Sequence, residues 1–186
     1  APADLAGRIR MAMAELQKLI AADGICIFLL ADDDCYHLRF SCGTSEKACH
    51  IFPIANKDSA VGHAGKQHRL TTFEELPSGC TDEIRLIEAE QLQSLAYIPI
   101  RSKEKQTFGV IRIGSRTPQQ FSPRLRNVLE LIGNRIAVAI ENAMLQEQVI
   151  KSEEKYRSVF NNDPNPIFII SPHTFQILDT NQTAQD

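Results

Sequence analysis

The stretch from Pro123 to Phe160 reads PRLRNVLELIGNRIAVAIENAMLQEQVIKSEEKYRSVF and decides how this chain is organised. Ser122 is placed to cap a helix, and Pro123 suits the first helical position, where a missing N–H costs nothing. The next proline is Pro164. The stretch therefore predicts one uninterrupted helix, longer than a single small domain needs.

Two interleaved apolar rows run along this helix at spacings of three and four residues. The first row is Leu125, Leu129, Ile132, Ile136, Ala139, Ala143, Gln146 and Ile150. The second row includes Leu131, Arg135, Val138, Asn142, Leu145 and Val149. One row can pack on the helix's own domain and leave the other for a second helix. Because polar residues in such a seam fix register, we expect the second row to form a homodimer interface, with the N- and C-terminal helices in contact. A helix buried all round within one domain is the alternative.

Composition bounds the class of protein. The chain has 186 residues, of which 43% are hydrophobic and 23% charged, enough for one core. A net charge of −3 with both signs interspersed argues against a nucleic-acid partner. The longest apolar run, residues 25–31, is too short for a bilayer span, so we expect no membrane contact. Five irregularly spaced cysteines favour a reducing cytoplasm.

The order of elements predicts an α+β fold. The expected elements are a helix at 4–22, strands at 25–31 and 36–41, short helices near 60–67 and 82–90, strands at 94–100 and 108–113, and the long helix. This order predicts an antiparallel sheet with the terminal helices on one face. The irregular middle of the chain would cover a ligand pocket on the other face.

Several motifs, in order, resemble a GAF domain over about residues 5–148. They are Gly62-x-x-Gly65, Ser94–Ile100, Phe108–Ile111, Phe121–Ser122 and Ile136–Ala143. From Ser152–Phe160, Pro164–Ile170 and Ile177–Asn181 the chain resembles the opening of a PAS domain. The predicted organisation is thus a GAF-like domain at 1–148, a linker helix at 149–160 and a truncated PAS-like start at 161–186. The sequence begins without Met and ends inside this last domain, so we expect a fragment of a longer protein.

The two resemblances together imply a function in signal input. GAF–helix–PAS order is similar to the input half of bacterial sensor histidine kinases, and less often of diguanylate cyclases. The implied module senses a small molecule or a redox cue and relays it through a dimeric helix. Catalysis is not expected in this fragment, since the kinase of the parent protein would lie outside it.

Six polar residues are the candidates for contact with a ligand: His63, His68, Arg69, Ser94, Tyr97 and Arg112. Arg112 shares strand parity with Phe108 and Val110, opposite Ile111 and Ile113, and could anchor an anion in the pocket. The alternative is an arginine in solvent at a sheet edge, with His63 and His68 as ordinary loop residues.

No cofactor is predicted. Asn56-Lys57 and Asp82-Glu83 are misplaced for the cyclic-nucleotide motif of GAF relatives, and an exposed turn suits Asn56-Lys57 better. Cys80 is one residue off a bilin attachment position and is expected to be a solvated loop cysteine. Haem and iron–sulfur binding have little support, because Cys35, Cys42 and Cys49 recur every seven residues without a compact pair.

Two other functions stay open. The domain could be a dimerising spacer without a ligand, which hydrophobic side chains filling the pocket would favour. It could also be a free methionine sulfoxide reductase, since Cys49 matches a cysteine of those GAF-fold enzymes. His63 stands where their second cysteine falls, which removes the resolving partner for thiol chemistry.

Overall fold

The computed structural model describes residues 2–51, 53–67, 69–102 and 104–185. Contacts divide the chain into two units, the first ending at Glu141 and the second beginning at Asn142. The division falls inside the long helix α5 (Pro123–Asn161). The finer division into a domain, a linker helix and a PAS-like start stays a prediction.

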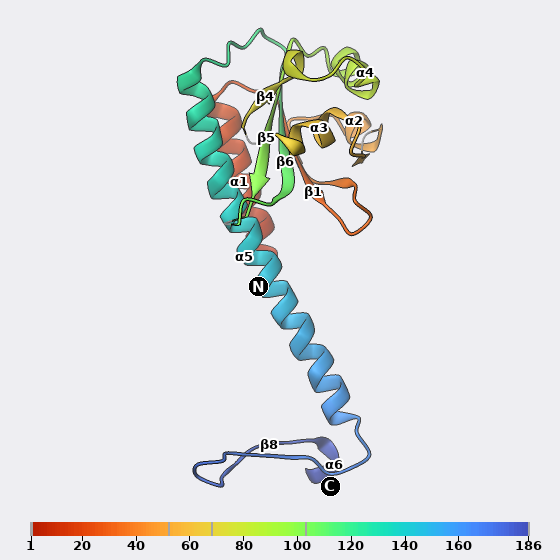
Figure 1. Cartoon of the computed structure of the whole chain (residues 1–186), viewed down its shortest axis with the longest axis vertical. Coiled ribbons are helices and arrows are strands. Elements are labelled where there is room, and N and C mark those ends of the chain that lie inside the picture. The colour runs from red at the N-terminus through yellow and green to blue at the C-terminus, as the bar shows by residue number, and fades with distance from the viewer. Residues whose placement is uncertain (1, 52, 68, 103, 186) are drawn as a thin grey trace. The chain divides into compact units, whose positions relative to one another are not determined.

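The first unit is built on a six-stranded antiparallel sheet with the order β3-β2-β1-β6-β5-β4 (Figure 1). The strands are β1 (Gly24–Leu30), β2 (Tyr36–Cys42), β3 (Ile54–Ala55), β4 (Thr71–Thr72), β5 (Ser94–Arg101) and β6 (Thr107–Ser115). The predicted α+β class and antiparallel sheet are confirmed. The short edge strands β3 and β4 belong to the irregular middle of the chain, where no alternating pattern predicts a strand.

One face of the sheet, here called the helix face, is covered by α1 (Pro2–Leu19) and the first half of α5 (Figure 1). Its core is a cluster of apolar side chains. The helices contribute Ile9, Met13, Leu16, Leu129, Ile136, Ala137 and Ile140, which pack on Ile25, Ile27, Ile98, Ile100, Ile111 and Ile113. Burying each large side chain of this kind stabilises the fold by about 1.5–3 kcal/mol. The placement of both terminal helices on one face is confirmed.

Helix α5 begins and ends close to where the sequence predicts. The backbone N–H of Leu125 donates to Ser122 Oγ at 3.3 Å, so Ser122 caps the helix before Pro123. The helix ends at Asn161, ahead of Pro164. Among the residues that the structure describes, no helix is long and apolar enough to cross a membrane.

The opposite face of the sheet, here called the cap face, is covered by short helices. These are α2 (Glu46–Ile51), α3 (Ala60–Lys66), the 3-10 helix η1 (Phe73–Glu75) and α4 (Thr81–Glu90). Ser59 caps α3 by accepting from the backbone N–H of Gly62 at 3.1 Å. A Cβ at Gly62 would collide with the backbone of Asn56 and Lys57, and one at Gly65 with the Tyr36 ring. The two glycines therefore let α3 lie close over the sheet.

A register shift in β6 changes the orientation of one predicted residue. The pairing of β5 with β6 slips between Ile100 and Arg101, which face Gly109 and Thr107. As a result Phe108 packs against the helix-face core, although simple alternation places it on the same face as Arg112. Val110, beyond the shift, lies on the cap face as expected.

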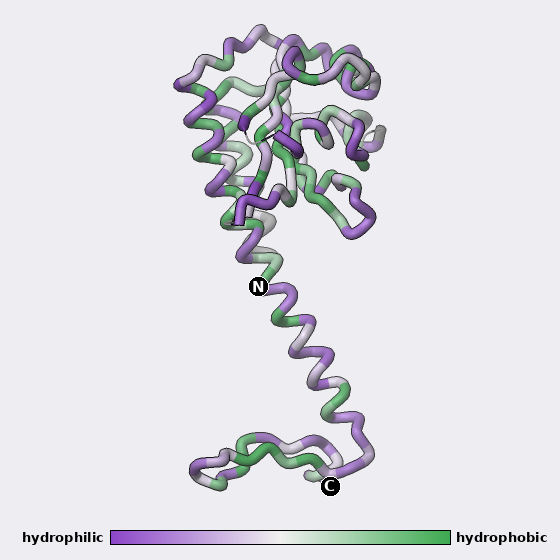
Figure 2. Tube along the Cα trace, viewed as in Figure 1, coloured by the Kyte–Doolittle hydropathy of each residue, from purple (hydrophilic) through white to green (hydrophobic). Residues whose placement is uncertain are grey.

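The second unit contains the end of α5 and a small hairpin. Strand β7 (Phe168–Ile170) pairs antiparallel with β8 (Ile177–Thr180), and the short helix α6 (Gln182–Gln185) follows. The fully buried Asn181 ties this unit together, because its Oδ1 accepts from the backbone N–H of Ile167 at 2.9 Å and its Nδ2 donates to the carbonyl of Asn165 at 2.8 Å. Both hairpin strands are largely hydrophobic and solvent-exposed (Figure 2).

Candidate functional site

Three polar or polarisable side chains form a row across the cap face of the sheet. Arg112 on β6 lies directly opposite Cys26 on β1 and Tyr97 on β5. Directly paired residues in a sheet point to the same side, so all three side chains enter the cap-face core with Phe28 and Val110. This row is the candidate site, because it brings a guanidinium, a phenol and a thiol together where apolar side chains are the rule.

The Arg112 guanidinium is buried and weakly partnered. Its side chain is 6% exposed. Nη2 donates to Cys26 Sγ at 3.5 Å, and the guanidinium carbon lies 5.0 Å from the centre of the Phe28 ring. Nη1 lies 3.8 Å from Glu83 Oε1, which is an ion pair beyond hydrogen-bond distance. A thiol is a weak acceptor, so most of the guanidinium's hydrogen-bonding capacity is unused.

Glu83 brings the counter-charge from α4. It lies in the first turn of that helix, and its side chain is 5% exposed. Burial raises the pKa of Glu83 above its usual range, and the Arg112 guanidinium offsets this only in part. For the Glu83 carboxylate, the cost of burial therefore outweighs the attraction of the guanidinium.

Tyr97 holds a hydroxyl without a partner. Its side chain is fully buried, and its hydroxyl is the single buried side-chain polar atom without a hydrogen bond in the part of the chain that the structure describes. Burial, followed by the nearby Glu83 carboxylate, raises the pKa of Tyr97 well above its usual value, so the phenol stays protonated. An unsatisfied buried hydroxyl costs about 1–3 kcal/mol.

A small cavity adjoins this row. It has a volume of about 20 Å³, room for roughly one water molecule. Arg112 and Cys26 form one wall, and Leu86 and Leu95 belong to its apolar lining. The aromatic rings of Phe28, Tyr36 and Tyr97 fill much of the remaining cap-face core. The predicted ligand pocket thus has little free volume.

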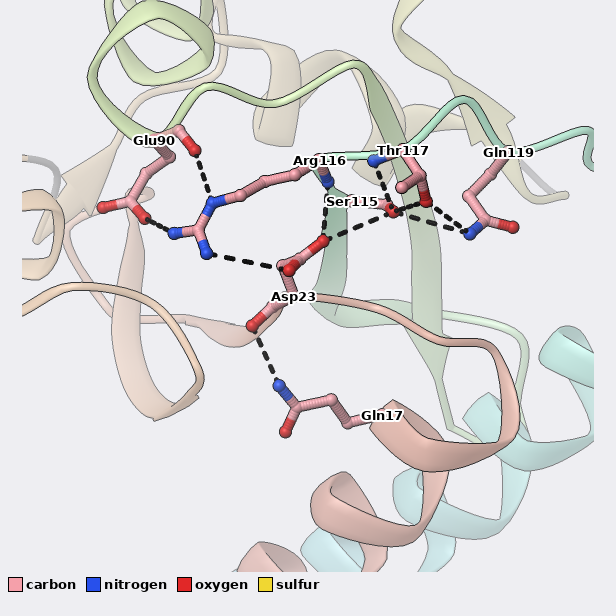
Figure 3. A network of polar contacts seen from close by, with 7 residues as sticks. All are labelled: Gln17, Asp23, Glu90, Ser115, Arg116, Thr117 and Gln119. Atoms are coloured by element: carbon pink, nitrogen blue, oxygen red, sulfur yellow. Dashed lines mark hydrogen bonds and ion pairs between the residues drawn. The ribbon is translucent and has the colours of Figure 1, made fainter.

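A second polar network lies at the far end of α4 (Figure 3). Arg116, just after β6, donates from Nε to the carbonyl of Glu90 at 2.9 Å and pairs with its carboxylate at 3.4 Å. The backbone N–H of Arg116 donates to Asp23 Oδ2 at 2.6 Å. Gln17 of α1 donates from Nε2 to the Asp23 carbonyl at 2.8 Å. This network joins α4 on the cap face to α1 on the helix face.

The structure separates the six predicted ligand residues. Tyr97 and Arg112 are neighbours in the buried row. His63 is half-buried on α3. Arg69 is 62% exposed and pairs with Glu75 at 3.5 Å, and Ser94 Oγ accepts from the backbone N–H of Gln119 at 2.7 Å. His68 lies outside the described residues.

The predicted dimer row lies on the surface of α5. Leu131 is 59% exposed, Val138 44%, Leu145 54% and Val149 66%, and Arg135 and Asn142 are also exposed. In the first row, by contrast, Leu129 and Ile136 are buried in the helix-face core. Hydrophilic and hydrophobic residues alternate along the last turns of the helix (Figure 2). The first row thus packs on the domain in its N-terminal part, while its last residues Gln146 and Ile150 are exposed. The second row stays exposed within this chain.

The cysteines differ in part from expectation. All five are free. The sequence predicted Cys80 to be solvated, but it is 6% exposed and precedes α4, and burial raises its pKa. The prediction was wrong because the Leu95 and Tyr97 strand packs over that loop. No three His, Cys, Asp or Glu side chains are close enough together to hold a metal ion, as far as the chain is described.

Glu83 is the functional candidate that the sequence reading missed. Glu83, Leu86 and Glu90 are spaced by three and four residues, and all three are buried on the inner face of α4. Helical periodicity places a carboxylate at position 83 on the apolar side of the helix, a signal that was available. The Asp82-Glu83 pair had drawn attention only as part of a nucleotide motif.

The comparisons with known proteins follow this geometry. The family model described as GAF domain matches residues 2–141, so the chain belongs to the GAF domain family. No curated protein sequence matches the chain.

Solved structures share the fold. The GAF domain region of a Geobacter sulfurreducens PCA protein superimposes with a TM-score of 0.62 at 24% identity, covering 74% of this chain and 93% of that one. The GAF domain of a two-component sensor histidine kinase from Bacillus halodurans gives 0.58 at 24% identity, covering 76% and 97%. A type II free methionine-R-sulfoxide reductase from Thermoplasma acidophilum gives 0.60 at 16% identity, covering 76% and 95%. Identities at this level establish the fold alone.

Proposed function

We propose that this chain is a sensory and regulatory input module of a bacterial signal-transduction protein, and that the cap face binds its small-molecule signal. One observation carries the proposal: the buried row holds a guanidinium and a phenol whose donors are largely unused. Proteins seldom leave such groups buried without a partner, because each one costs stability. A ligand that supplies acceptors would account for their presence.

The relay of the signal would pass through a homodimer. The exposed row that includes Leu131, Val138, Leu145 and Val149 offers the apolar seam that a second copy of α5 would cover. The network of Arg116, Asp23 and Gln17 connects the cap-face helix α4 with α1, and so gives a physical route from pocket to terminal helices. A ligand that shifts α4 would thereby change how the helices pack in the dimer.

A two-component sensor histidine kinase is the proposed parent protein, with the cytoplasm as its compartment. The solved GAF domain of the Bacillus halodurans kinase has the same fold. The hairpin β7–β8 with its buried Asn181 supplies the first strands that a PAS domain would need, and further chain would cover the exposed Phe168, Ile177 and Leu178. We propose no catalysis for the fragment itself.

A ligand-free spacer is the second candidate, and the small cavity favours it. Phe28, Tyr36 and Tyr97 fill much of the cap face, as expected for a pocket that no longer binds a ligand. Free methionine sulfoxide reductase activity is the third candidate, because the Thermoplasma acidophilum enzyme has the same fold. Its candidate thiol here, Cys49, is half-buried on α2. An assay of free methionine sulfoxide reduction with a dithiol reductant tests that candidate directly.

The dimer is tested by the native mass of the chain and of two variants. Light scattering after gel filtration should give a doubled mass for the unchanged chain. Val138→Glu places a charge in the exposed row and should give a monomer. Asn127→Glu, exposed on the same helix but outside both rows, should leave the dimer intact. If the unchanged chain is monomeric at high concentration, the proposed relay through a homodimer is wrong.

The ligand is tested separately by mass spectrometry of small molecules released on denaturation, and by thermal unfolding against a metabolite panel. A released compound or a raised unfolding temperature supports sensing. A chain that releases nothing and responds to nothing, yet dimerises, is the spacer.

A further inference from the structure

We propose that the buried row is a closed site for a small carboxylate-bearing anion, and that Glu83 occupies the position of the ligand's carboxylate until the ligand displaces it. The inference rests on the proposed sensory function and adds the chemical class of the signal. It also assigns the moving part, because Glu83 belongs to α4.

Donors exceed acceptors in the row. The Arg112 guanidinium has five N–H donors, and its contacts are a thiol at 3.5 Å, an aromatic ring and a carboxylate oxygen at 3.8 Å. The Tyr97 hydroxyl adds a further donor without an acceptor. The two residues are directly paired across β5 and β6, so a carboxylate on the guanidinium would lie on the same face of the sheet as the hydroxyl. The site therefore calls for an oxygen anion rather than a cation or a neutral apolar ligand.

Glu83 satisfies this demand poorly, because it is tethered to a helix. Its Oε1 stops 3.8 Å from Arg112 Nη1, about 1 Å beyond a charge-assisted hydrogen bond. A free carboxylate carries no such tether and can close that gap. Two carboxylates cannot share one buried guanidinium without repelling each other, so a ligand would replace Glu83 rather than join it.

The adjoining cavity sets the size of the ligand. It provides about 20 Å³ beside Arg112, with Cys26, Leu86 and Leu95 in its walls. Asp23 and Glu90 also line it, and both carboxylates pair with Arg116. A carboxylate placed on Arg112 could extend a short apolar remainder into this space. With α4 in its present position, this volume accommodates one methyl-sized group. Acetate, a carboxylate with one methyl group, is therefore the natural probe.

Helix α4 would respond at one end. Its inner face carries Glu83 in the first turn and Glu90 in the last residue, with Leu86 between them. Glu90 is held by Arg116 and by a hydrogen bond from Ser45 Oγ. Loss of the Glu83 contact therefore frees the start of α4, while its end stays anchored to the network that reaches α1 (Figure 3).

The test measures acetate binding by calorimetry, with acetamide as the neutral isostere. Glu83→Gln removes the competing charge and should tighten acetate binding at least tenfold, with no comparable gain for acetamide. Glu88→Gln is the matched control, because Glu88 is exposed on the outer face of α4, and it should leave the affinity unchanged. Tyr97→Phe removes only the hydroxyl and should weaken acetate binding by about fivefold, the worth of one hydrogen bond.

A second readout follows α4 itself. Hydrogen exchange of residues 81–86 should speed up in the unchanged chain when acetate is added, while exchange at residues 87–90 stays slow. Glu83→Gln should show fast exchange at 81–86 without any ligand.

Three outcomes would overturn the inference. They are equal acetate affinity in Glu83→Gln and Glu88→Gln, acetamide binding as tight as acetate, and Tyr97→Phe binding acetate as well as the unchanged chain. The proposed function fails differently. If acetate binds at Arg112 without altering the dimer, only the proposed relay of the signal fails. If the protein releases a neutral ligand on denaturation, the proposed sensory function stands and the inference of an anionic ligand fails.

Discussion

The two faces of the sheet are built by opposite rules. On the helix face, α1 and α5 cover a core of apolar side chains. On the cap face, the same three central strands present Arg112, Tyr97 and Cys26 to short helices, and Glu83 enters the core from α4. The helix face supplies stability, whereas the cap face accepts buried charge and an unpaired hydroxyl that cost stability. Functional sites are where such costs are tolerated.

The largest expected effect comes from breaking the ion pair on one side. Arg112→Met leaves the Glu83 carboxylate buried without a counter-charge, which should lower the free energy of unfolding by about 3–5 kcal/mol. The double variant Glu83→Leu/Arg112→Met makes the cap face resemble the helix face and should recover most of that loss. Urea unfolding of the three proteins measures both values. A double variant as unstable as the single one would mean that the pair supports the fold.

A cavity created on the helix face should lower the free energy of unfolding nearly as much as Arg112→Met, without changing ligand affinity. Leu129 is fully buried, so Leu129→Ala should lower the free energy of unfolding by about 2–5 kcal/mol. Asn127→Ala, two residues away on the same helix, exposed and outside both rows, should change it by less than about 0.5 kcal/mol. Acetate affinity of the folded Leu129→Ala protein should equal that of the unchanged chain. A marked loss of affinity would contradict the separation of the two faces.

Removal of the orphan hydroxyl should stabilise the protein. Tyr97→Phe deletes a buried donor that has no partner, so the free energy of unfolding should rise by about 1 kcal/mol. Tyr156→Phe, about half exposed on α5, is the control and should stay within about 0.5 kcal/mol. Destabilisation by Tyr97→Phe would show that the hydroxyl has a structural partner.

The smallest effect is a pH dependence. The fold raises the pKa of Glu83 from its ordinary value of 4.5, mainly through burial and also through Asp82, against the opposing Arg112. The folded chain thus holds a proton that the unfolded chain releases near pH 4.5. Stability from this group is fully present below that pH and declines as pH rises to the folded pKa.

This pH dependence is measured as a difference between two proteins. Glu83→Gln removes the titration, so the free energy of unfolding of the unchanged chain, minus that of the variant, should fall as pH rises from about 4.5. Glu88→Gln should show the slope of the unchanged chain. A difference that rises with pH would mean that Arg112 outweighs burial.

Much of the fold could be read from the sequence, because its signals are local or periodic. Ser122 and Pro123 mark the start of α5, and the unbroken apolar run at 25–31 marks the central strand β1. The GAF resemblance rested on motifs in order and is confirmed. Strands β3 and β4, of two residues each, carry no periodic signal and depend on neighbouring strands for their pairing.

The site was predictable only in part. Strand alternation placed Arg112 on the correct face, and Tyr97 lies beside it as a cross-strand neighbour. Cys26, hidden in an apolar run, gave no sign of a contact with Arg112 from a point 86 residues later in the chain. The separation of Arg69 and Ser94 from the row depends on their partners Glu75 and Gln119, which sequence spacing does not indicate.

The elements, the two rows of α5 and the class of fold could be inferred from the amino-acid sequence, because they follow from periodicity, capping and the order of motifs. The contact of Arg112 with Glu83, the Tyr97 hydroxyl without an acceptor and the small volume of the pocket emerge only when the chain is folded. The physical reason is distance along the chain. Hydrogen bonding and burial of a side chain depend on residues that folding brings together from separate elements, and a single sequence does not record those encounters.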